Sequence, residues 1–172
     1  MTSIKELSNL KGRHALISGA TGGKGKVIAD TLTELGSDLV LVDWPGSDLD
    51  SLNVYLTERW GVKIEHCFCD LGLQEQRTEL MDWLKSGVQG LNILIKNAAF
   101  VGTSNIQGWA VPFEQQTIGT WRCALEVNLT AVFDLCQGLT RILKAADGAN
   151  IINIASIYGR SIRPGLWFVR RH

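Results

Sequence analysis

The sequence has no excess of charge of one sign and no long apolar run. Its 172 residues include 17 lysines and arginines and 17 aspartates and glutamates, so the formal net charge is zero. The basic residues are scattered, except for Arg170, Arg171 and His172, whereas nucleic-acid-binding proteins cluster them on one surface. No apolar run reaches the ~18 residues of a membrane-spanning helix. We therefore expect neither nucleic acid nor a membrane as a partner.

Secretory and metal-binding patterns are also missing. Residues 1–13, MTSIKELSNLKGR, lack the apolar core of a secretory signal, which favours a cytoplasmic protein with its four cysteines reduced. His66, Cys67 and Cys69 suggest zinc, but both cysteines fall on one face of a predicted strand. No second ligand pair has the spacing of a zinc site, so we expect no metal.

Glycine, in contrast, is concentrated in SGATGGKG at residues 18–25. Glycine lets the backbone approach a phosphate that a side chain would block. The nucleoside-triphosphate loop G-x-x-x-x-G-K-[ST] does not fit. Counted from Gly19, its second glycine would fall on Lys24, and the later Gly25-Lys26 pair lacks the following Ser or Thr.

A dinucleotide-binding turn fits this loop better. The form T-G-x-x-x-G-x-G matches Ser18, Gly19, Gly23 and Gly25, with Ser in place of Thr. Such a turn joins a first strand to a helix whose positive N-terminus faces the pyrophosphate. The surrounding sequence agrees, because an apolar run precedes the loop and a helical pattern follows it.

Strand and helix patterns alternate along the chain. The nearly continuous apolar run DLVLVD is typical of a parallel strand covered on both faces. The pattern predicts an α/β fold with a doubly wound parallel sheet (Rossmann fold), in which ligands bind beyond the carboxyl ends of the strands. The predicted strands are 13–18, 38–43, 62–69, 91–96 and 150–156, and the predicted helices are 23–35, 48–60 (capped by Ser47 or Asp48), 74–85 and 119–144.

Asp43 ends the second predicted strand, 24 residues after Gly19. A carboxylate about 20 residues after the glycine turn commonly accepts hydrogen bonds from the ribose hydroxyls of a dinucleotide. It would repel a ribose 2′-phosphate, so we expect NAD to be preferred over NADP.

Six segments, in this order and spacing, resemble the short-chain dehydrogenase/reductase family. The resemblance implies a domain at residues 1–160 that binds NAD or NADP, whereas residues 161–172 resemble no family segment. It also implies hydride transfer between the nicotinamide and a small-molecule alcohol or carbonyl substrate. The segments are SGATGGKG (18–25), VD (42–43), CDL (69–71), KNAA (96–99), VNLTAVF (127–133) and INIASIYG (152–159).

The resemblance implies a role for each matching residue. Asn128 resembles the Asn that bends a helix and orders a water in a proton relay. Ser156 resembles the Ser that hydrogen-bonds the substrate oxygen. Asp70 resembles the Asp that contacts the adenine. The implied cofactor-binding residues are Ser18, Gly19, Thr21, Gly23, Lys24, Gly25, Asp43, Asp70, Leu71, Asn97, Ala98 and Ala99.

Three residues depart from the family pattern. Lys24 occupies a position that the family fills with Ile or Leu, so its side chain must reach solvent or a phosphate. Lys96 and Ala99 replace the first Asn and the Gly of the family's N-N-A-G turn. Ala99 adds a methyl group near the expected cofactor.

The family's catalytic Tyr, followed four residues later by Lys, is missing. Of the two tyrosines, Tyr55 is followed at the Lys position by Arg59, and Tyr158 by Ile162. We therefore expect a C-terminally truncated family member with little activity and an exposed apolar edge at its fifth strand. The family's homo-oligomer is a further implied partner, although the expected interface helix is largely absent.

Two other classes of function remain open. A regulatory module would bind the dinucleotide without turning it over. A methyltransferase also places an acidic residue after its second strand, but it lacks the N-A-[AG] turn and the Ser after strand five.

Overall fold

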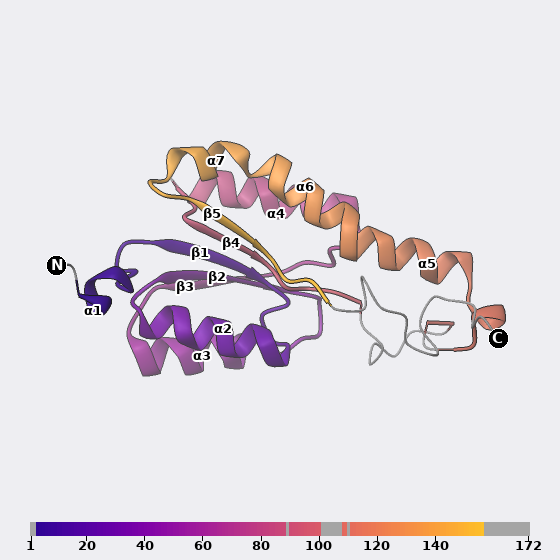
Figure 1. Ribbon diagram of the computed structural model, residues 1–172, viewed down its shortest axis with the longest axis horizontal. Coiled ribbons are helices and arrows are strands. Elements are labelled where there is room, and N and C mark those ends of the chain that lie inside the picture. The colour runs from indigo at the N-terminus through magenta and orange to yellow at the C-terminus, as the bar shows by residue number, and fades with distance from the viewer. Residues whose placement is uncertain (1–2, 89, 101–107, 110, 157–172) are drawn as a thin grey trace.

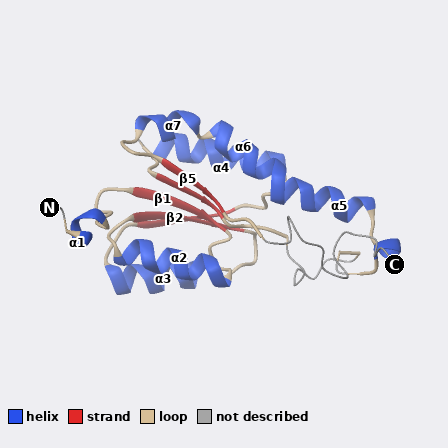
Figure 2. Ribbon diagram, in the orientation of Figure 1, coloured by secondary structure: helices blue, strands red, loops and turns tan. Residues whose placement is uncertain are grey.

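A computed structural model describes residues 3–88, 90–100, 108–109 and 111–156. These residues form three layers, with a parallel sheet between two layers of helices (Figures 1 and 2). The predicted tail 161–172 and Tyr158 lie outside the described residues.

The sheet has five parallel strands in the order β3-β2-β1-β4-β5. The chain therefore winds outward from β1 in one direction and then in the other, which confirms the predicted doubly wound fold. The strands are β1 (His14–Ser18), β2 (Asp38–Asp43), β3 (Ile64–Phe68), β4 (Ile93–Lys96) and β5 (Asn150–Asn153).

Helices cover both faces of the sheet. The pair α2 (Gly23–Glu34) and α3 (Leu49–Trp60) lies on one face. The helix α4 (Gln74–Gly87) lies on the other face with α6 (Ala131–Gly138) and α7 (Thr140–Ala145) (Figure 1). The predicted helix 119–144 is present as four consecutive pieces. These are α5 (Ile118–Leu125), the π-helix η2 (Glu126–Thr130), α6 (Ala131–Gly138) and α7 (Thr140–Ala145).

Two short helices were not predicted. The helix α1 (Ile4–Leu7) begins with a capping box, in which Ser3 and Glu6 each bond the other's backbone N–H. The 3₁₀ helix η1 (Phe113–Gln115) lies between β4 and α5. Asp48 precedes α3, as expected of its cap, but its side chain makes no capping hydrogen bond.

Alternate residues of β1 face opposite layers, which explains the continuous apolar strands. Leu16 packs in a cluster with Leu84 of α4 and Leu139 beyond α6. Its neighbour Ile17 packs in a second cluster with Leu56 of α3. Each strand thus needs apolar side chains on both faces.

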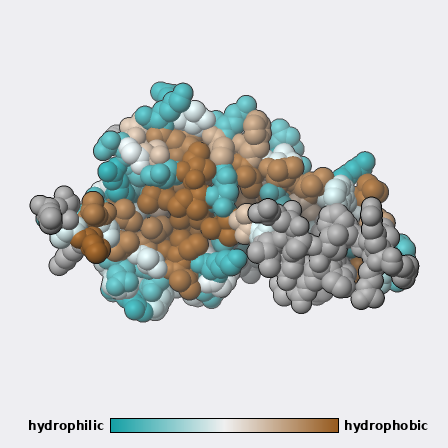
Figure 3. All heavy atoms as spheres, in the orientation of Figure 1, coloured by the Kyte–Doolittle hydropathy of each residue, from teal (hydrophilic) through white to brown (hydrophobic). Residues whose placement is uncertain are grey.

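The strand β5 forms an edge of the described sheet. Ile151, Ile152 and Ile154 remain 45%, 43% and 37% exposed, as expected of an apolar edge. Figure 3 shows hydrophobic surface between the two helical layers on the viewed face. Among the described residues, no helix is both long and apolar enough to span a bilayer.

Candidate functional site

The candidate site begins where β1 and β4 end side by side. Ser18 is buried, and its Oγ accepts hydrogen bonds from the backbone N–H groups of Asn97 (3.2 Å) and Ala98 (3.3 Å). The Asn97 side-chain amide donates in return to the carbonyl oxygens of Ser18 (3.3 Å) and Gly19 (2.9 Å). These reciprocal bonds hold the glycine turn against the turn after β4. The structure therefore brings these four predicted residues together at the point where the strand order reverses.

Three glycines in the turn have different surroundings. Gly19 has φ +66°, and a Cβ there would lie 2.7 Å from the Ala98 Cα. A Cβ on Gly25 would lie 2.1 Å from the Gly19 carbonyl oxygen, so this glycine permits α2 to pack on the turn. A Cβ on Gly23 would meet nothing within 4 Å. Gly19 and Gly25 thus serve packing, whereas Gly23 leaves open space beside the first turn of α2.

The N-terminus of α2 favours an anion. Its cap, Gly22, provides no side-chain hydrogen bond, and its first turn holds no acidic residue. Lys24 is exposed in that turn. Its side chain therefore reaches solvent, which was one of the two outcomes expected for it. The helix dipole and this lysine together make the end of the helix positive.

Asp43 lies across the glycine turn at the end of β2. Its Oδ2 accepts from the Thr21 backbone N–H (2.8 Å) and hydroxyl (2.7 Å), and its Oδ1 accepts from the Trp44 backbone N–H (2.9 Å). The carboxylate therefore fixes the turn as well as carrying a negative charge beside it. The sequence pattern placed Asp43 here but did not reveal its bonds to Thr21.

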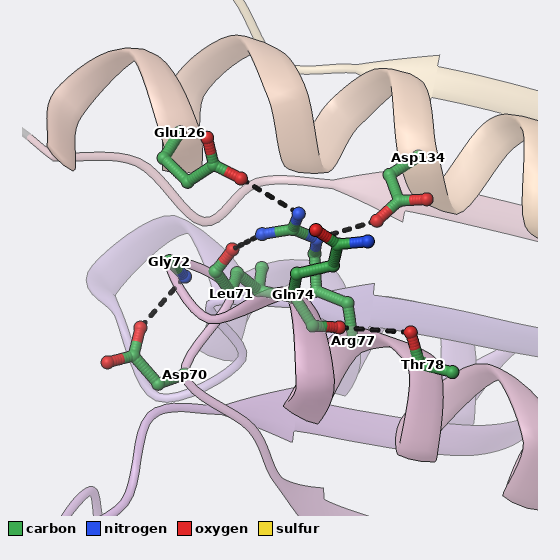
Figure 4. A network of polar contacts seen from close by, with 8 residues as sticks. All are labelled: Asp70, Leu71, Gly72, Gln74, Arg77, Thr78, Glu126 and Asp134. Atoms are coloured by element: carbon green, nitrogen blue, oxygen red, sulfur yellow. Dashed lines mark hydrogen bonds and ion pairs between the residues drawn. The ribbon is translucent and has the colours of Figure 1, made fainter. Parts of the chain in front are cut away.

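Asp70 and Leu71 lie in the loop between β3 and α4 (Figure 4). The Asp70 carboxylate accepts from the Gly72 backbone N–H (2.8 Å), and the Asp70 backbone N–H donates to the Gln76 Oε1 (2.7 Å). Both bonds are local, and they set the shape of the loop that follows β3.

A buried arginine that the sequence analysis did not identify joins this loop to the helices above it. Arg77 of α4 is 2% exposed and donates to the Leu71 carbonyl (2.7 Å), the Glu126 Oε1 (2.8 Å) and the Asp134 Oδ2 (2.7 Å) (Figure 4). Burial opposes its charge, but the hydrogen bonds to both carboxylates outweigh burial and raise the pKa of Arg77. A signal was present in the sequence. Arg77 interrupts an apolar row at helical spacing, Leu73, Leu80, Met81 and Leu84.

Asn128 lies in the π-helix η2, which begins at Glu126. Its Oδ1 accepts from the Phe100 backbone N–H (2.8 Å), and its Nδ2 donates to the Phe100 carbonyl (3.2 Å). The side chain thus pairs with the backbone that continues from the β4 turn. A π-helix interrupts regular helical geometry and is frequent at functional sites, which agrees with the expected irregularity at this residue.

Ser156 and Ala99 follow the ends of β5 and β4. Ser156 is exposed, three residues beyond the end of β5. Ala99 is exposed immediately after Ala98. Both follow strands whose carboxyl ends meet at the edge of the sheet where Ser18 and Asp43 lie, because all five strands are parallel.

The cysteines show no metal-binding arrangement within the described residues, where no three His, Cys, Asp or Glu side chains gather closely enough to hold an ion. Burial raises the pKa of Cys69 to about 12, and burial followed by the charge of Glu79 raises that of Cys67. The thiols of Cys67 in β3 and of Cys69 just after it are therefore protonated at neutral pH and weakly nucleophilic.

Comparison with known proteins identifies the family. A family model described as short chain dehydrogenase matches residues 13–167. The chain therefore belongs to the short-chain dehydrogenase family of oxidoreductases. Nodulation protein G of Rhizobium sp. (strain N33) is 31% identical over 156 residues, which cover 91% of this chain and 59% of that protein.

A tropinone reductase homolog of Arabidopsis thaliana is 32% identical over 155 residues, which cover 88% of this chain and 55% of that protein. The chain thus spans little more than half the length of these relatives.

Solved structures share the fold. L-sorbose reductase from Gluconobacter frateurii, complexed with NADPH and L-sorbose, has a TM-score of 0.78 and 26% identity over 87% of this chain and 54% of that chain. NADPH-dependent 3-quinuclidinone reductase from Rhodotorula rubra has a TM-score of 0.80 and 24% identity, covering 94% and 59%.

Gly25, which is closely packed, and Gly23, which faces open space, give a paired prediction on stability. We expect Gly25→Ala to lower the free energy of unfolding by about 1–3 kcal/mol, because its methyl group would overlap the Gly19 carbonyl. Gly23→Ala should leave stability unchanged or raise it by up to ~1 kcal/mol, since Ala favours helix and the space is open. Urea unfolding of both variants checks this, and equal losses would contradict it.

The Arg77 network gives a second prediction. Arg77→Met should lower the free energy of unfolding by about 2–4 kcal/mol, because it leaves the Glu126 and Asp134 carboxylates without their cationic partner. This loss of stability should be smaller than for a fully buried ion pair, because solvent reaches the Glu126 and Asp134 side chains, which are 35% and 27% exposed.

Lys85→Met is the matched control for this measurement. It breaks the exposed Lys85–Asp82 pair on the same helix and should change stability by less than ~0.5 kcal/mol. A similar effect of both substitutions in urea unfolding would show that the Arg77 network contributes no more than a surface ion pair.

Proposed function

We propose that this chain binds a nicotinamide dinucleotide at the carboxyl edge of its sheet, as an oxidoreductase that acts on a small alcohol or carbonyl compound in the cytoplasm. The observation that carries the proposal is the glycine turn. Gly19 is seated on Ala98, while the backbone at Gly23 stays open beside the positive end of α2. This arrangement admits a diphosphate, which needs close backbone approach and N–H donors.

The residues around the turn fit the rest of such a cofactor. The backbone of residues 19–25 and Lys24 would hold the diphosphate. Asp43 would accept from the ribose hydroxyls, and the Asp70–Leu71 loop would line the adenine end. Asn97, Ala98 and Ala99 would border the cofactor along the end of β4. A bound nicotinamide would supply the hydride acceptor or donor.

The preferred cofactor within this class is NAD in our proposal. The Asp43 Oδ2 already accepts two hydrogen bonds from Thr21, but its Oδ1 accepts only one, from the Trp44 backbone N–H, and keeps a further lone pair for a ribose hydroxyl. The same negative charge repels a 2′-phosphate. The similar L-sorbose reductase is complexed with NADPH, and the similar 3-quinuclidinone reductase is NADPH-dependent. Our proposed preference for NAD therefore depends on Asp43 of this chain.

The reacting groups in our proposal are Ser156, which would hydrogen-bond the substrate oxygen, and Asn128, which would hold a relay water. The 172 residues contain no Tyr followed four positions later by Lys. Positioned general acid–base groups contribute ~10² to 10⁴ in rate. We therefore propose that this chain alone binds the cofactor, but that it turns its substrate over at least ~10²-fold more slowly than it would with a positioned Tyr and Lys.

Cofactor binding is tested by titrating NADH and following energy transfer from the six tryptophans. We expect saturable binding to the wild-type chain and about tenfold or weaker binding to Gly23→Ala, because the added methyl group would occupy the space beside α2. Gly87→Ala is the control, since it also faces open space on a helix but lies at the far end of α4.

Absence of saturable binding to wild type would overturn the proposed function. Equal binding to wild type and Gly23→Ala would instead reject the site. Turnover of an alcohol panel by the NAD-bound chain then separates a slow enzyme from a regulatory module that only binds.

The NAD preference is tested with Asp43→Asn. We expect wild type to bind NADH more tightly than NADPH. The neutral amide of the variant should shift the ratio of the two affinities about tenfold toward NADPH, because it removes the repulsion between Asp43 and the 2′-phosphate. Thr21→Val is the control, because it removes the hydroxyl bonded to Asp43 and keeps the carboxylate. Tighter binding of NADPH than of NADH by wild type would contradict the proposed preference for NAD and would show that this chain prefers NADP.

A further inference from the structure

A buried lysine contacts a cysteine behind the candidate site. Lys96 ends β4 and is 3% exposed, and its Nζ donates to the Val132 carbonyl (3.3 Å) and contacts the Cys136 Sγ. Both partners belong to α6. Lys96 takes part in none of the ion pairs found among the described residues. Within the part of the chain that the structure describes, the Cys136 thiol is thus the side chain that contacts this buried amine.

Cys136 differs from its partner in access. It is half-buried and lines a groove of about 420 Å³ with Thr140, Leu143 and Ile151. A small oxidant that enters the groove can therefore approach Cys136, whereas Lys96 is not among the residues that line it. Cys69 has no such access, because it is 2% exposed.

We propose that peroxide oxidation joins the Cys136 sulfur to the Lys96 nitrogen through a covalent S–N bond. Hydrogen peroxide first oxidises the thiol to a sulfenic acid and is itself reduced to water. The Lys96 nitrogen then attacks the sulfur through its lone pair, the S–N bond forms as the S–O bond breaks, and a second water leaves with a proton from nitrogen. One thiol, one amine and one peroxide thus give one S–N bond and two waters. Sulfenic acids undergo the same condensation with backbone nitrogen.

The bond would tie the end of β4 to α6 across 40 residues of sequence. A cross-link that closes a loop of this length restricts the unfolded chain and raises the midpoint of thermal unfolding, here by about 5–10 °C. The bond would also fix Lys96, the residue before Asn97.

The test treats the folded chain with hydrogen peroxide and analyses tryptic peptides by mass spectrometry. We expect the peptides containing Lys96 and Cys136 to be joined, with a mass about 2 Da below their sum. Cleavage after Lys96 should be blocked, and dithiothreitol should restore both peptides. The bridge should disappear in Lys96→Arg and in Cys136→Ser, either of which suffices if the other fails to fold.

Cys123→Ser is the matched control, because Cys123 is an exposed thiol of α5, and its removal should leave the bridge intact. Oxidation of Cys136 only to sulfinic acid or to a disulfide would overturn the proposal. So would a bridge that persists in Lys96→Arg, or a Cys136 thiol that stays reduced under peroxide that oxidises Cys123.

Discussion

The contact of Gly19 with Ala98 is the constraint on which the candidate site depends. The two turns after β1 and β4 approach so closely that a Cβ on Gly19 would lie 2.7 Å from the Ala98 Cα. Ser18 and Asn97 hold this approach through four hydrogen bonds that use side chains from both turns. The strands β1 and β4 are neighbours at the reversal of strand order, where a doubly wound sheet leaves a crevice beyond the carboxyl ends of its strands. The close contact therefore sets the floor of the site, and α2 sets its wall.

Arg77 connects the two outer parts of the site. One of its bonds goes to the Leu71 carbonyl in the loop after β3, and another goes to Glu126 at the start of the π-helix that carries Asn128. The guanidinium fork suits this task because it donates in several fixed directions and retains its charge when buried. The loop after β3 and the helix region of Asn128 are thus held by one side chain, although they are about 55 residues apart in sequence.

The sequence predicted all five strands because each has apolar residues on both faces and a turn signal at its end. The long helices followed from their periodicity. The capping box of α1 was readable in Ser3 and Glu6, but four residues form too short a pattern for periodicity to reveal. The resemblance predicted an irregular helix at Asn128, but not its pairing with the Phe100 backbone, which lies 28 residues away in sequence. Pattern analysis likewise placed Asp43 but not its bond to Thr21, which joins two loops.

The departures from the family pattern find different physical solutions. Lys24 needs no compensation, because the first turn of α2 is open to solvent. Lys96 lies inside, so its amine must be satisfied by α6, through the Val132 carbonyl and the Cys136 sulfur. This links the position of α6 to the residue that precedes Asn97. The end of β4 is therefore held on both of its sides, at Lys96 by α6 and at Asn97 by the glycine turn.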